Sequence, residues 1–195
     1  MENLVITNVY IFILALVLAV LEIQIEGPNG WAKNLPTWRP KLEKWYVRWY
    51  MKFMSGREAT GYHITMFTFV FLIFNLPYVF GLSLNLEHYL KTLAFFFIFI
   101  VLWDFLWFVL NPHYPLKKFK SEHIWWHKKW LLGAPVDYYG GLILSLIILL
   151  PLAYFNNSTS VIFWWWQNIL LFVAETLILI IFSFWVLDID NWNKK

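Results

Sequence analysis

The fold is decided around residues Asp104–Pro135, which read DFLWFVLNPHYPLKKFKSEHIWWHKKWLLGAP. An apolar run ends in this stretch, a basic segment follows, and another apolar run begins directly after it. Pro112 and Pro115 prevent the first run from continuing as a helix. Three of the five histidines fall here, namely His113, His123 and His127. Asp104 precedes the end of the apolar run by about seven residues, so we expect its carboxylate roughly 10 Å inside a membrane helix.

Working outward, the composition is that of an integral membrane protein. The 195 residues are 61% hydrophobic and only 14% charged, which is rare for a soluble domain. Five apolar runs approach or exceed the ~20 residues that cross the hydrocarbon of a bilayer. The predicted spans are residues 4–23, 62–84, 90–110, 136–154 and 161–187. We therefore predict an all-α integral membrane protein with five transmembrane helices, in which residues 1–195 form a single helical domain.

The basic residues predict the orientation. Fourteen of the fifteen Lys and Arg residues fall on one side of a five-span arrangement, and Lys91 is the exception. By the positive-inside rule that side is the cytoplasm, which places the N-terminus outside and the C-terminus inside. A bacterial or archaeal cytoplasmic membrane, or an equivalent one, is the expected location.

Two interfacial amphipathic helices are predicted in the cytoplasmic loops. In residues 40–54, aromatic and aliphatic side chains recur at helical spacing with Lys and Arg between them. Lys44, Arg48 and Trp49 are the candidate headgroup contacts, either as a general lipid anchor or as a dedicated site for an anionic headgroup. The second helix is predicted over residues 121–132 and would place His123 and His127 on one face.

Two acids lie at membrane depth, Asp104 and Glu175. An ionised carboxylate inside a span costs at least ~2.5 kcal/mol, so such residues indicate a functional site. Three explanations remain open for them. The acids are protonated, or they accept hydrogen bonds from histidine or tyrosine, or they face a bound cation.

A metal site is the interpretation that uses most of these polar residues. The candidate ligands share an oxygen or imidazole donor and the cytoplasmic end of the bundle; they are Glu22, Glu26, Asp104, His113, Glu122, His123 and His127. Such a carboxylate-rich set favours iron or manganese over zinc. His63 and Glu175 are the candidate catalytic groups, as proton donors or as support for the ligands.

Several classes of function are excluded or disfavoured. The chain has no cysteine, which excludes disulfides, thiolate metal sites and iron–sulfur clusters. Its net charge of +3 is too small to indicate nucleic-acid binding. Five histidines are too few for the several histidine boxes of membrane desaturases and hydroxylases. Haem would need opposed histidines, and those available lie near helix ends, where burial is poor.

Two hypotheses of different class follow. The first is a membrane metalloenzyme, most simply an oxidoreductase, that acts on a lipid or another hydrophobic small molecule at the cytoplasmic interface. The second is a non-enzymatic protein with protonated buried acids: a lipid or small-molecule binder, a transporter or a subunit of a complex. Membrane lipids are the expected partners in both, and oligomerisation is compatible with either.

Overall fold

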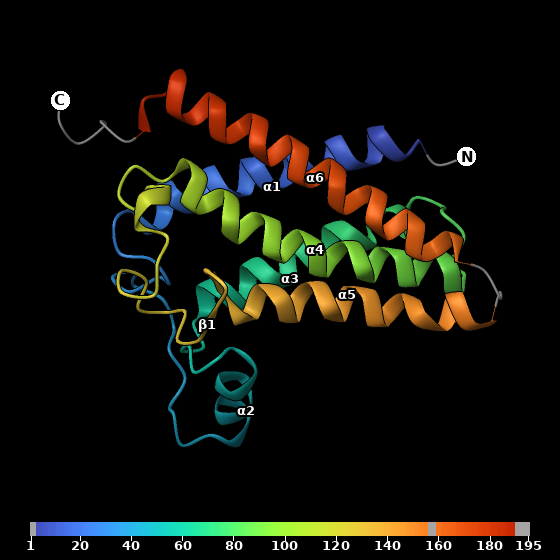
Figure 1. The fold of residues 1–195 in the computed structure, drawn as a ribbon. Helices are drawn as coiled ribbons and strands as arrows, with labels where there is room; N and C mark the ends of the chain where they lie inside the picture. Colours follow the sequence, from blue (N-terminus) through green and yellow to red (C-terminus); the bar gives the residue numbers. More distant parts are fainter. Residues whose placement is uncertain (1–2, 156–158, 190–195) are drawn as a thin grey trace.

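The computed structural model describes residues 3–155 and 159–189, and five long apolar helices dominate it (Figure 1). These helices are α1 (Leu4–Glu26), α3 (Gly61–Val79), α4 (Leu86–Leu110), α5 (Val136–Phe155) and α6 (Ser160–Trp185). Each is long and apolar enough to cross a membrane. The predicted all-α membrane fold is confirmed. Part of the predicted single domain, residues 1–2, 156–158 and 190–195, lies outside the described residues.

Short polar side chains begin three of the five helices. Asn3 accepts a hydrogen bond from the backbone N–H of Ile6 at the start of α1, and Asn85 accepts one from His88 at the start of α4. At the start of α3 the hydroxyl of Thr60 accepts from the backbone N–H of His63. These caps satisfy N–H groups that a helix leaves unpaired. The α3 cap also fixes the place of His63.

The central helix is α4, which packs against α1, α3, α5 and α6 (Figure 1). In its most apolar stretch 61% of the residues are buried, against 33% or less in the other four helices. Phe99 and Leu106 are fully buried on it. The outer helices instead expose large apolar side chains, such as Leu72 and Ile178, as a lipid-facing surface requires.

Polar contacts inside the bundle attach α6. The side-chain amide of Asn8 on α1 donates to Asn168 Oδ1 on α6 at 2.9 Å, and both residues are fully buried. The indole N–H of Trp165 donates to the Ser145 hydroxyl on α5 at 2.9 Å. Buried hydrogen bonds of this kind hold transmembrane helices together where lipid supplies no hydrophobic driving force.

The short elements gather at one end of the bundle. They are α2 (Trp45–Phe53), the single turn η1 (Leu116–Lys118), and the strands β1 (Trp130–Leu131) and β2 (Ala134–Pro135), which pair antiparallel. Helix α2 lies within the predicted range 40–54 and exposes the aromatic rings of its apolar face.

The predicted interfacial helix over residues 121–132 is wrong. Residues 121–129 form turns and extended chain, and Trp130–Leu131 form a strand. Ile124 and Trp126 are both buried although they are two positions apart, which would place them on opposite sides of a helix. Trp126 stacks on Phe108 of α4, with ring centroids 5.9 Å apart. Packing against the end of α4 therefore overrides the local helical pattern.

Candidate functional site

A cavity of about 580 Å³ lies between the helices, at the end of the bundle that carries the short elements. One part of its wall is charged and the rest is apolar. The charged or titratable side chains of the wall are Glu22, Glu26, Arg57, His63, Asp104, His127, Asp137 and Tyr138. They come from α1, α3, α4, α5 and two connecting segments, so the fold brings together residues that are distant in sequence.

The first polar group consists of Glu22 and Glu26, one turn apart on α1, and His63 in the first turn of α3. One donor atom from each of the three lies within 4.8 Å of the other two. Glu26 and His63 are buried, and Glu22 is half-buried on the cavity wall. His63 Nε2 is 3.5 Å from Glu26 Oε1. Two carboxylates and one imidazole thus converge on one point.

The segment after α1 supports this group. The ring of Trp31 stacks on His63, with centroids 3.8 Å apart and planes 15° apart. The backbone N–H of Ala32 donates to Glu26 Oε1 at 2.5 Å. Trp31 and Ala32 both have positive φ, 47° and 49°, a conformation that costs energy outside glycine. The chain is bent sharply here to bring Trp31 and Ala32 against the two side chains.

The orientation of the His63 ring is also set from its other nitrogen. His63 Nδ1 lies 2.8 Å from Thr60 Oγ1, within hydrogen-bonding distance. Nε2 is thereby left to face the carboxylates. A hydrogen bond at one ring nitrogen that aims the other is the usual arrangement of metal-binding histidines.

The second polar group is centred on His127, which is only 2% exposed. Its Nε2 lies 3.2 Å from Asp104 Oδ2 on α4, and its Nδ1 lies 3.4 Å from Asp137 Oδ2 on α5. The hydroxyl of Tyr138 donates to Asp104. Arg57, which is also buried, donates to Asp137 Oδ2 at 2.7 Å. This is a charge network that links α4, α5 and the two connecting segments.

Two opposing effects act on the pKa of His127. Burial lowers it, because the imidazolium loses its hydration. The negative charge of Asp104 and the hydrogen bonds to Asp104 and Asp137 raise it, and they prevail, so the pKa lies above its ordinary value. His127 therefore favours the charged form, with both nitrogens donating to carboxylates.

The two groups face one cavity, and Asp104 lies within electrostatic range of Glu22, Glu26 and His63. Asp104 itself is already held by His127 and Tyr138. Asp104 therefore lies next to the first polar group, but its hydrogen-bond partners belong to the second polar group.

Five of the predicted site residues meet at this cavity: Glu22, Glu26, His63, Asp104 and His127. The proposed hydrogen bonding of Asp104 to a histidine and a tyrosine is observed. His123 does not share a face with His127, because residues 121–129 are not helical. Glu122 is exposed and lies 3.3 Å from His123.

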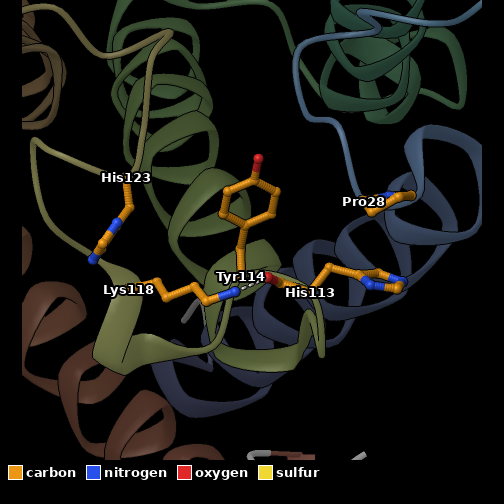
Figure 2. A pocket seen from close by; sticks show the side chains of 5 residues that line it. All are labelled: Pro28, His113, Tyr114, Lys118 and His123. Carbon is orange, nitrogen blue, oxygen red and sulfur yellow. Dashed lines mark hydrogen bonds between the residues drawn. The ribbon is translucent and has the colours of Figure 1, made fainter. Parts of the chain in front are cut away.

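His113 and His123 instead line a separate surface pocket of about 390 Å³. Figure 2 shows His123 and Pro28 on opposite sides of this pocket, with Tyr114 and Lys118 between them. The Lys118 ammonium donates to the backbone carbonyl of His113 at 3.1 Å.

The remaining candidates also lie outside the cavity. Glu175 is half-buried on α6, where its Oε2 has no hydrogen-bond partner among the described residues. Arg48 and Trp49 lie on α2 and Lys44 directly precedes it, and all three are exposed. Only the end of α2 reaches the cavity, through Phe53 and the following Met54.

Sequence reasoning missed Arg57, Asp137, Tyr138 and Trp31. Asp137 is the second residue of α5, at the end of the span, so the sequence indicates its burial less clearly than that of Asp104. Arg57 is one of several basic residues in its loop, and the sequence does not distinguish it from the others. Trp31 follows the turn Gly27–Gly30, and no sequence pattern indicates that the residues after this turn support a site.

A search with protein-family models, the curated proteins and the solved structures finds no match to this chain.

Proposed function

We propose that the protein is an integral membrane, metal-dependent enzyme that acts on a lipid or another hydrophobic molecule. Glu22, Glu26 and His63 hold the metal in this proposal. The observation that carries it is the convergence of these three donors, within 4.8 Å of one another, on the wall of a cavity that is otherwise largely apolar.

The charge balance of the cavity wall supports the binding of a cation. Glu22, Glu26, Asp104 and Asp137 carry four negative charges when ionised, and Arg57 and a protonated His127 balance two of them. Two negative charges are left, which is what a divalent metal ion would neutralise. Uncompensated charges of this kind are costly away from water, so a bound cation would stabilise the site.

The donor set favours iron or manganese over zinc, because two of the three donors are carboxylates. A metal held there would act as a Lewis acid or as a redox centre. The protein side chains would supply the rest: Trp31 and Thr60 orient His63, and the apolar wall excludes water. His127 and Asp104 are an acid–base pair that lines the same cavity, suited to moving a proton. Iron in the site would make the reaction an oxidation or reduction.

The test is the metal content of the protein, purified in detergent without chelators and measured by inductively coupled plasma mass spectrometry. We expect near-stoichiometric iron or manganese in the wild type. Glu26→Gln should lose it, because glutamine keeps an acceptor for the Ala32 N–H but removes the charge. His63→Ala should lose it as well.

The control is His123→Ala, which removes an exposed histidine outside the cavity and should keep its metal. Retention of metal in both Glu26→Gln and His63→Ala would contradict the proposed ligands. A wild type without metal would favour the second hypothesis, a lipid-binding protein with protonated acids. That hypothesis has its own support in Glu175, whose Oε2 has no hydrogen-bond partner among the described residues, as a protonated acid inside a span allows.

A further inference from the structure

The apolar part of the cavity extends away from the charged groups along α4 and α5. Phe97 and Val101 line it on α4, and Gly140 and Leu144 line it on α5. Phe97 precedes Asp104 by seven residues, which corresponds to roughly 10 Å along the helix axis. The cavity is therefore elongated in the direction of the spans, with its charged groups toward the end of the bundle.

The cavity also opens through the side of the bundle. Gly140 and Leu144 are one turn apart on α5, and both line the cavity while remaining exposed at the molecular surface. This surface belongs to a span, so hydrocarbon surrounds it in a bilayer. Phe67 of α3 lines the cavity as well. A molecule that enters between α3 and α5 comes from the lipid phase.

Two adjacent glycines have different functions in α5. A Cβ atom on Gly141 would lie 2.6 Å from Val101 Cγ2, so this glycine permits the close approach of α5 to α4. A Cβ atom on Gly140 would meet nothing within 4 Å. The missing side chain at position 140 thus leaves space in the cavity and serves no packing contact. A larger residue fits the helix there and reduces the cavity.

We propose that this space binds a single hydrocarbon chain of a membrane amphiphile, whose polar end then lies at the charged groups. The inference rests on the proposed function, because it names the substrate class of the same site. The volume of about 580 Å³ lies in the range of roughly 300–1,000 Å³ that small ligands occupy. The apolar side chains of the wall contact the hydrocarbon chain, and the charged groups contact the polar end of the amphiphile. Gly140 sets the width of the entrance.

The experiment is photolabelling of the detergent-purified protein with palmitic acid that carries a diazirine in its chain, followed by peptide mass spectrometry. Labels are expected on the α4 segment around Phe97–Val101 and on Leu144. Gly140→Phe should abolish these labels because the ring occupies the space of the chain. Leu150→Phe is the matched control on the same helix, exposed and outside the cavity, and should leave them unchanged.

Equal labelling in Gly140→Phe and Leu150→Phe, or the absence of these labels from the wild type, would overturn the inference. Labels on the lipid-facing side of α6 serve as an internal standard in every sample. A phosphatidylcholine with the same photoreactive chain, used in parallel, distinguishes a free fatty acid from an intact lipid as the source. Metal analysis of the same samples separates the two proposals: specific labelling without metal would keep the chain site and refute the metal site.

Discussion

At the scale of single residues, His127 connects α4 and α5 at the cavity. It faces Asp104 of α4 on one side and Asp137 of α5 on the other, and Arg57 and Tyr138 adjoin the same carboxylates. Because its pKa is raised in the folded protein, protonation stabilises the fold. This contribution is complete below the unfolded pKa of about 6.5 and is lost as the pH rises through the raised folded pKa.

The corresponding prediction compares the wild type with His127→Gln by thermal unfolding in detergent, from about pH 6 to about pH 9. The wild type should be more stable at the acid end, and its advantage should shrink as the pH rises. Each unit by which the pKa is raised corresponds to about 1.4 kcal/mol of the advantage that is lost. His123→Gln, which changes an exposed ring, should follow the wild type. A constant difference across the pH range would show that His127 acts as a neutral residue.

The same residues show how far a sequence can be read. Asp104 could be predicted as a candidate because hydropathy gives the depth of a carboxylate in a span, and Glu26 because it lies at the cytoplasmic end of the first span. The pairing of His127 with Asp137 could not be predicted, because hydropathy says nothing about the rotation of a helix about its axis. Arg57 lies outside the spans, and only the path of the chain after α2 carries it to Asp137.

At the scale of elements, the polar contacts of α6 can be tested. Asn8 and Asn168 pair in a fully buried position between α1 and α6. Asn168→Leu removes the side-chain acceptor, which leaves the Asn8 amide only its longer contact, 3.3 Å, with the backbone carbonyl of residue 168. We expect a loss of about 1–2 kcal/mol, measured by unfolding in mixed micelles with increasing dodecyl sulfate.

The double variant with Asn8→Leu should recover much of this loss, because no buried amide is then left unpaired. Leu170→Ala, which truncates an exposed side chain of α6, should have little effect. A double variant as unstable as the sum of the two single variants would mean that the amides act independently.

The elements also differ in how well their patterns predict them. The five spans follow from long apolar runs, and their ends deviate by a few residues: α3 ends at Val79 although the run was predicted to reach residue 84. The segment 121–132 is short and polar, so its local pattern is weak. Buried contacts of Trp126 and His127 decide its conformation, and such contacts are set by the tertiary structure.

At the scale of the whole molecule, the distribution of charge predicts which end faces the cytoplasm. Of the thirteen Lys and Arg residues in the described ranges, Lys91 alone belongs to the end with the α3–α4 and α5–α6 connections. The other end carries α2 and the strands (Figure 1). The cavity lies at that end. By the positive-inside rule we expect the cavity to open at the cytoplasmic side of the membrane.

The chain has no cysteine, so one introduced cysteine can report this orientation without background. Ser83→Cys lies in the α3–α4 connection and Lys41→Cys in the α1–α2 connection, both exposed. A membrane-impermeant maleimide should label Ser83→Cys in intact cells and Lys41→Cys only after lysis. The opposite result would place the cavity at the outer face. The metal and the chain of the amphiphile would then have to be drawn from the outer compartment and the outer leaflet, which changes the substrates open to the site.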